Sequence, residues 1–162
     1  MPTTAILVDG GFYRKRANLL FGPKSPAERA KELISYCCRH LDREDETRTL
    51  YRIFYYDCAP SEKTVMHPLT QKSINLKKTD LYKWNVDFLN ALRRQRKVAV
   101  RMGELLESNI GYVLKGEITK KLCRKEITID DLTEEDFLLD IQQKGVDMKI
   151  GLDISSLAYK KQ

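Results

Sequence analysis

Short apolar runs alternate with segments of helical spacing along most of the chain. Three runs of apolar, β-branched and aromatic residues are typical of strands buried in a sheet: 3–9, 50–57 and 97–103. Four segments place their apolar residues at helical spacing: 12–21, 25–42, 81–95 and 146–162. In the second of these, Ser25 is the expected cap and Pro26 takes the first helical position. The alternation predicts a single α/β domain over residues 1–162, with a central parallel sheet.

Two stretches interrupt this alternation. Residues 58–80 are polar and irregular, with several lysines. Residues 104–135 are predicted as an irregular insertion. Within it, GYVLKG and EITKKL fit either a hairpin or inserted residues without a hairpin. The segment TEEDFLL at 133–139 starts like a helix but is ambiguous.

The final helix stops at Lys160-Lys161-Gln162 without a glycine cap, a turn or a further strand. A helix that is apolar on nearly all sides normally packs on a sheet and leads into another parallel strand. We therefore expect the natural domain to continue beyond residue 162. A complete domain that ends in a helix is the alternative.

The charge balance narrows the class of partner. The chain has 29 Lys and Arg against 23 Asp and Glu, a net charge of +6, and a pI near 9.1. Such an excess favours a polyanionic partner such as nucleic acid, because clustered cations release counterions from phosphates. A solvated basic surface that only aids solubility fits the same numbers.

Cysteine and histidine do not point to a metal site. The four cysteines include no CxxC pair and the two histidines have no nearby ligand partner, so we expect reduced thiols and no zinc. No stretch approaches the roughly 20 apolar residues of a membrane span, and the chain shows no signal peptide. These features lead us to expect a cytoplasmic protein.

Two aspartates directly follow or end predicted strands. Asp9 comes after the first strand and precedes Gly10-Gly11, which would let a ligand approach the backbone. Asp57 ends the second strand in the same way. In open parallel sheets, ligands bind at the carboxyl ends of the strands, so both carboxylates are candidates for one site. Each could instead cap a helix or close a turn.

Asp147 is a third candidate, on helical geometry. At 100° per residue it falls in line with Gly151, Ile154 and Ala158, which predicts a carboxylate in the middle of the face that packs on the sheet. A buried carboxylate is costly unless it is paired or bound to metal. The alternative is an N-terminal charge that stabilises the helix dipole. By the same geometry Asp153 is predicted on the solvent side.

Carboxylates without His or Cys suit Mg²⁺ or Mn²⁺, which prefer oxygen ligands. Such a metal activates water and stabilises charge on a phosphodiester. Basic residues cluster around the third strand, along the insertion and in the loop after the second strand, which favours a surface that follows phosphates. Solvated charged faces explain the same clusters.

Three segments resemble a known family: AILVDGGFYRKR at 5–16, RIFYYDC at 52–58 and QKGVDMKIGLDISSLAY at 143–159. They are similar to the NYN domain, in its LabA-like branch, within the PIN-like nuclease superfamily. The resemblance implies a three-layer α/β/α fold whose edge carboxylates bind Mg²⁺ or Mn²⁺ and hydrolyse RNA. It implies that Asp9 and Asp147 bind the metal and that Lys144 and Gly145 help to place the phosphate, and it leaves open whether Asp57 is a third member of the site.

The chain departs from that family at its end, where the family continues into a strand with a Ser-Gly-Asp-Ser-Asp-Phe-like motif. We therefore expect either a metal-dependent endoribonuclease or a non-catalytic RNA-binding module, including an inactive fragment of such a nuclease. The expected partner is RNA, in its single-stranded form. A homo-oligomer, or a second chain that supplies the missing segment, fits as well. The residues expected to contact RNA are Arg14, Lys15, Arg94, Arg96 and Lys144.

Overall fold

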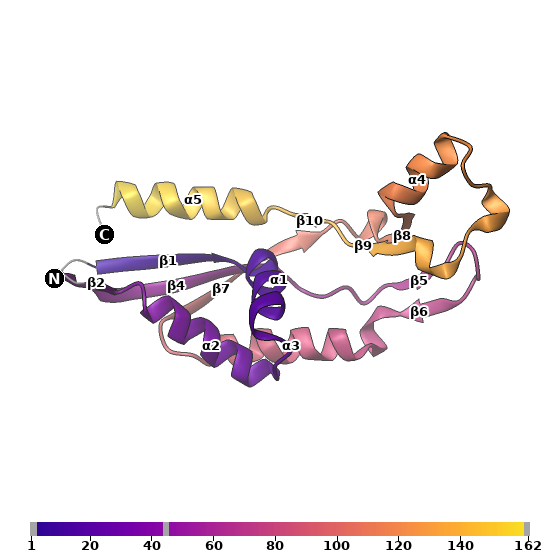
Figure 1. Cartoon of the computed structure of the whole chain (residues 1–162). Coiled ribbons are helices and arrows are strands. Elements are labelled where there is room, and N and C mark those ends of the chain that lie inside the picture. The colour runs from indigo at the N-terminus through magenta and orange to yellow at the C-terminus, as the bar shows by residue number, and fades with distance from the viewer. Residues whose placement is uncertain (1–2, 44–45, 161–162) are drawn as a thin grey trace.

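A four-stranded, mostly parallel sheet forms the centre of the computed structural model, which describes residues 3–43 and 46–160 (Figure 1). Its strands follow the order β1-β4-β7-β10, and only β10 is antiparallel to its neighbour. Their bounds are β1 Thr3–Asp9, β4 Thr49–Cys58, β7 Val98–Leu105 and β10 Gln143–Lys144. The three longer strands are those predicted from the apolar runs. The predicted α/β class and central, mainly parallel sheet are confirmed.

In the part of the chain that the structure describes, five α-helices surround or extend from this sheet. They are α1 Gly10–Phe21, α2 Pro26–Cys38, α3 Asp80–Arg93, α4 Gly116–Cys123 and α5 Val146–Tyr159. At the start of α2 the predicted cap is present: Ser25 Oγ accepts from the Glu28 amide, and Glu28 Oε2 accepts from the Ser25 amide. The predicted end of α2 near Asp42 is wrong, because a turn follows Cys38 and a short strand begins at Asp42. The predicted end of α5 at Gln162 lies outside the described residues.

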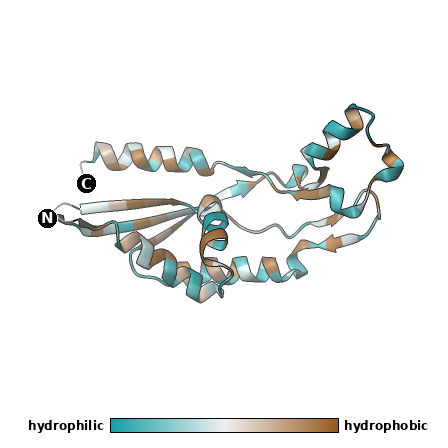
Figure 2. Ribbon diagram, viewed as in Figure 1, coloured by the Kyte–Doolittle hydropathy of each residue, from teal (hydrophilic) through white to brown (hydrophobic). Residues whose placement is uncertain are grey.

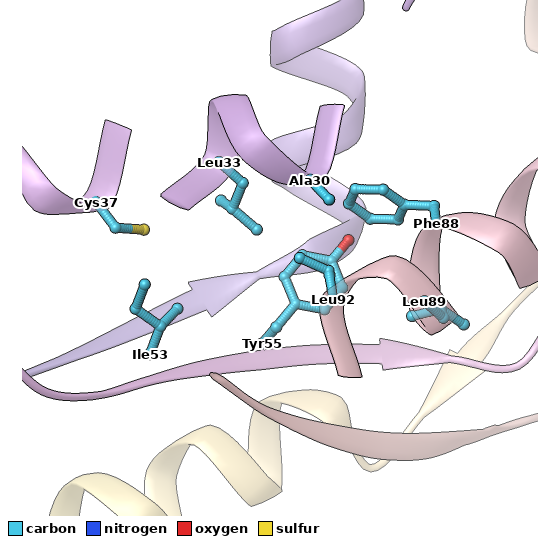
Figure 3. Close-up of a cluster of buried hydrophobic side chains, with 8 residues drawn as sticks. All are labelled: Ala30, Leu33, Cys37, Ile53, Tyr55, Phe88, Leu89 and Leu92. Carbon is cyan, nitrogen blue, oxygen red and sulfur yellow. The ribbon is translucent and has the colours of Figure 1, made fainter. Parts of the chain in front are cut away.

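Alternate residues of β4 point to opposite faces of the sheet, and both faces are covered. On one face Ile53 and Tyr55 pack with residues of α2 and α3, as Figure 3 shows. On the other face Phe54, Tyr56 and Cys58 pack against Val146 at the start of α5. A central strand buried on both sides explains why 50–57 reads as a nearly continuous apolar run.

The insertion folds as a separate lobe beyond the carboxyl ends of the strands (Figure 1). GYVL forms β8 (Gly111–Leu114), which pairs in antiparallel fashion with β9 (Phe137–Asp140). EITKKL belongs to α4, so these two segments are a strand and a helix rather than a hairpin. The ambiguous segment TEEDFLL starts as a single 3₁₀ turn, Glu134–Asp136, in which Thr133 and Asp136 exchange hydrogen bonds, and then passes into β9.

The remaining short elements flank these units. They are β2 Asp42–Arg43, β3 Glu46–Thr47, β5 Thr64–Met66 and β6 Ser73–Asn75, with 3₁₀ turns at Leu76–Lys78, Glu107–Asn109, Ile129–Asp131 and Glu134–Asp136.

All four cysteines are free thiols, as predicted. Within residues 3–43 and 46–160, no helix is long and apolar enough to span a membrane. Figure 2 shows hydrophobic segments along the central strands and along α5.

Candidate active site at the carboxyl edge of the sheet

The three parallel strands end close together at one edge. The register aligns Asp9 of β1 with Tyr56 of β4, and Cys58 of β4 with Gly103 of β7. Val146, which begins α5, lies over the same edge, because a Cβ built on Gly103 would stand 2.7 Å from its Cγ2. The end of β1, the end of β4 and the start of α5 therefore meet at the position where open parallel sheets bind their ligands.

Asp9 is an exposed carboxylate at this edge. Its Oδ1 accepts a hydrogen bond of 2.9 Å from the Phe12 amide and so caps α1. The capping role that the sequence left open is thus present. The side chain remains exposed to solvent. A carboxylate that is fixed at one oxygen and open to solvent remains available to a cation.

The two glycines after Asp9 serve different purposes. A Cβ on Gly10 would lie 2.5 Å from Tyr55 Cζ and 2.6 Å from the Tyr56 carbonyl oxygen, so only glycine allows α1 to start this close to β4. A Cβ on Gly11 would meet Asp9 Oδ1 at 3.5 Å and Gln143 Oε1 at 3.6 Å, which are ordinary contacts. Gly10 therefore serves packing, and Gly11 borders the side-chain oxygens of Asp9 and Gln143.

Asp57 is buried and accepts four hydrogen bonds. It is 1 % exposed and accepts from Arg14 Nη2 at 3.0 Å, Tyr55 Oη at 3.1 Å, the Cys58 amide at 2.8 Å and Gln143 Nε2 at 3.1 Å. Burial, with the negative charge of Asp57 next in importance, raises the pKa of Tyr55. Three of these donors meet Oδ1, and the Tyr55 hydroxyl alone meets Oδ2. The described geometry makes Asp57 an anchor for Arg14 and Gln143.

Strand alternation explains why Asp9 and Asp57 do not form a carboxylate pair. Asp57 continues the series of Ile53 and Tyr55, which faces α2 and α3. Asp9 continues the β1 series that contains Leu7, which packs on the α5 side. A shared site for Asp9 and Asp57 was predicted on the condition that their strands are neighbours. The strands β1 and β4 are neighbours, but the two side chains leave the sheet on opposite faces.

The predicted orientation of α5 is wrong. Asp147, Gly151 and Ile154 are exposed, whereas Val146 is buried and packs with Ile150 against the sheet. Periodicity could not select the face, because apolar residues occur on nearly all sides of this helix. Asp147 still lies in the first turn of α5, at the same edge and on the same side of the sheet as Asp9. Its carboxylate is directed to solvent instead of the core.

Asp153, predicted on the solvent side, holds α5 to the sheet. Its Oδ2 accepts from Tyr56 Oη at 2.7 Å and pairs with Arg101 Nε at 3.2 Å. Burial, followed by this hydrogen bond, raises the pKa of Tyr56. The guanidinium of Arg101 in turn lies over the Phe54 ring, 5.4 Å from its centroid.

We expect Asp153→Ala to lower the free energy of unfolding by roughly 1–2 kcal/mol, because the Tyr56 hydroxyl loses its acceptor. Asp147→Ala removes an exposed carboxylate at a helix start, so its effect should be about 0.5 kcal/mol or less. Urea denaturation of both variants measures the two values. Equal losses, or a larger loss for Asp147, would contradict the observed orientation of α5.

The basic residues expected to bind RNA divide between two edges. Arg14 lines the candidate site but is held by Asp57, while Lys15 and Lys144 are exposed near it. Arg94 and Arg96 lie in the turn before β7, at the amino end of the strands. Val98 and Gly103 are five residue steps apart along β7, roughly 16 Å at 3.3 Å per step. Arg94 and Arg96 therefore cannot contact the phosphate that Asp9 would engage.

The side-chain oxygens at this edge are of the kind that coordinate a hard cation. Gln143 donates its Nε2 to Asp57, which leaves Oε1 on the side of Gly11 and Asp9. Mg²⁺ commonly uses one or two carboxylates together with other oxygens and substrate phosphate. Within the described ranges, no three His, Cys, Asp or Glu side chains converge. Sequence reasoning missed Gln143, because an amide in a polar segment carries no signal of its own until Asp57 is placed beside it.

No family model, curated protein or solved structure matches this chain. Its function is therefore inferred from its own residues. These are an exposed carboxylate at the carboxyl edge of a parallel sheet, an oriented amide oxygen beside it, and cationic side chains around both.

Proposed function

We propose that this protein is a metal-dependent endoribonuclease of the PIN-like type, with an NYN domain. The observation that carries the proposal is the exposed carboxylate of Asp9 at the carboxyl edge of the sheet, with the amide oxygen of Gln143 on the other side of Gly11: a Cβ on Gly11 would lie 3.5 Å from Asp9 Oδ1 and 3.6 Å from Gln143 Oε1. The fold supports it through a mostly parallel sheet with helices on both faces. The net charge of +6 supports a phosphodiester substrate.

Asp9, Gln143 and Asp147 are the residues that would hold Mg²⁺ or Mn²⁺. The metal, when bound, supplies an activated water and stabilises negative charge on the phosphate. The chain supplies the orientation: Asp57 holds Gln143 through Nε2, so that Oε1 is presented on the side of Asp9. Lys144 and Lys15, both exposed near this edge, attract the phosphate backbone.

The test is cleavage of a generic single-stranded RNA with Mn²⁺ by the chain and by Asp9→Asn. Asparagine is as good a helix cap as aspartate, so the variant removes the charge and keeps the bond to the Phe12 amide. We expect loss of at least 100-fold in rate, on the order seen when a metal ligand or its support is removed. EDTA should abolish cleavage by the parent chain.

Asp130→Asn is the matched control, since Asp130 is an exposed aspartate of the lobe. It should cleave at the parental rate. Cleavage by Asp9→Asn at the parental rate would sink the proposal.

A second function is favoured by a specific observation. In residues 3–43 and 46–160 no group of three His, Cys, Asp or Glu side chains converges, while exposed cations surround the edge. A non-catalytic RNA-binding module needs only the exposed cations. It predicts salt-sensitive RNA binding that is the same in Asp9→Asn and in EDTA, without cleavage by either form.

A further inference from the structure

A groove of about 720 Å³ opens beside the candidate site. Its walls come from α1, from α3, from the chain after β4 and from the link between β9 and β10. Gly11, Arg14 and Gln143 belong to both the groove and the candidate site. The volume lies within the range of roughly 300–1,000 Å³ that is typical of sites for small ligands.

The charge on this groove is of one sign. Arg14, Lys15 and Lys24 line it, and no aspartate or glutamate does so among the described residues. A second groove on the molecule is lined by both signs, with Glu62, Glu104 and Glu107 beside two cations, so single-sign lining is not a general property of this surface.

The three cations differ in what holds them. Arg14 is tied to Asp57, and Lys24 pairs with Glu32 on α2. Lys15 is exposed and makes no hydrogen bond or ion pair within the part of the chain that the structure describes. Lys15 is therefore the cation that can engage an anion without breaking an internal contact.

The groove also presents apolar and amide surface. Leu81 and Ile141 are 68 % and 42 % exposed, and both line it. Trp84 supplies a rigid wall, since its ring stacks on Phe88 at 5.1 Å and its Nε1 donates to the Lys24 carbonyl at 2.9 Å. The amide side chains of Asn18 and Asn85 lie among the lining residues. This is a combination of a flat apolar surface, hydrogen-bonding groups and an unpaired cation.

We infer that this groove binds one unpaired nucleotide of single-stranded RNA, next to the phosphate held at the candidate site. The inference rests on the proposed function and deepens it. The base lies against Leu81 and Ile141, and its phosphate pairs with Lys15. An unstacked base exposes its apolar faces and its hydrogen-bonding edges, which a base inside a duplex does not.

The test separates binding from cleavage by working in EDTA. The affinity of a fluorescent oligouridine of about ten nucleotides, a length typical of single-strand sites, is measured by anisotropy for the full chain and its variants. Lys15→Glu and Leu81→Asp should each weaken binding about tenfold or more, which corresponds to roughly 1.4 kcal/mol. An RNA duplex of the same length should compete poorly.

Two control variants match these changes away from the groove. Lys121→Glu reverses a charge on α4, and Leu152→Asp places a charge at an exposed leucine of α5. Both should bind within about twofold of the parent, since neither residue lines the groove. Equal losses in the controls, equal competition by the duplex, or no binding of oligouridine by the parent would overturn the inference.

The outcomes distinguish this inference from the proposed function. Groove-dependent binding without Mn²⁺-dependent cleavage would support the nucleotide site and contradict the nuclease. Cleavage that Asp9→Asn abolishes, with oligouridine affinity unchanged by Lys15→Glu and Leu81→Asp, would support the nuclease and overturn the nucleotide site.

Discussion

Replacing Asp57 with alanine should lower the free energy of unfolding by roughly 2–4 kcal/mol. The carboxylate is 1 % exposed, and its loss leaves the Tyr55 hydroxyl, the Cys58 amide and Gln143 without their acceptor. The Arg14 guanidinium also loses its counter-charge, but Arg14 is 24 % exposed, so water screens part of that cost. We therefore place the expected loss below that of a completely buried ion pair.

Urea denaturation, with the slope compared between variants, measures this loss. Asp57→Asn keeps one acceptor oxygen and should cost less than Asp57→Ala. Asp130→Ala, at an exposed aspartate of the lobe, should change stability by about 0.5 kcal/mol or less. A loss below about 1 kcal/mol for Asp57→Ala would show that the four donors find other partners and that Asp57 is not the anchor of this edge.

Gly10→Ala should cost roughly 2–3 kcal/mol, in the upper part of the range for overpacking. The added Cβ would overlap the Tyr55 ring and the Tyr56 carbonyl, at 2.5 Å and 2.6 Å. The ring is buried in the core and the carbonyl belongs to the central strand, so neither can move aside cheaply. Thermal or chemical unfolding of the variant gives the value directly.

Gly11→Ala is the matched control, one residue further along the same helix. Its Cβ would make only ordinary contacts at 3.5 Å and 3.6 Å, and alanine favours helix over glycine by up to about 1 kcal/mol. Stability should therefore be unchanged or slightly higher. If both substitutions destabilised the protein equally, the close approach of α1 to β4 would not be the reason that glycine is required at residue 10.

Several features were determined by local sequence alone. The first strand ends at Asp9 as predicted, because a continuous apolar run stops at a carboxylate followed by two glycines. The start of α2 follows from the side chains of Ser25 and Glu28, whose mutual hydrogen bonds span three residues. Parallel strands bring their carboxyl ends to one edge, so the position of the candidate site could be predicted as well.

Tertiary structure alone decided which side chains that edge uses. Gln143 and Asp57 are 86 residues apart in the sequence and only meet because β10 pairs with β7 beside β4. On the observed face of α5, Val146 and Ile150 pack on the sheet and Asp153 meets Tyr56 and Arg101. A helix that is apolar on nearly every side has no intrinsic preference for a face, so the surface that receives it makes the choice. The spacing of apolar residues indicates which secondary structure a segment favours. The candidate site, in contrast, depends on contacts between segments that are far apart in the sequence.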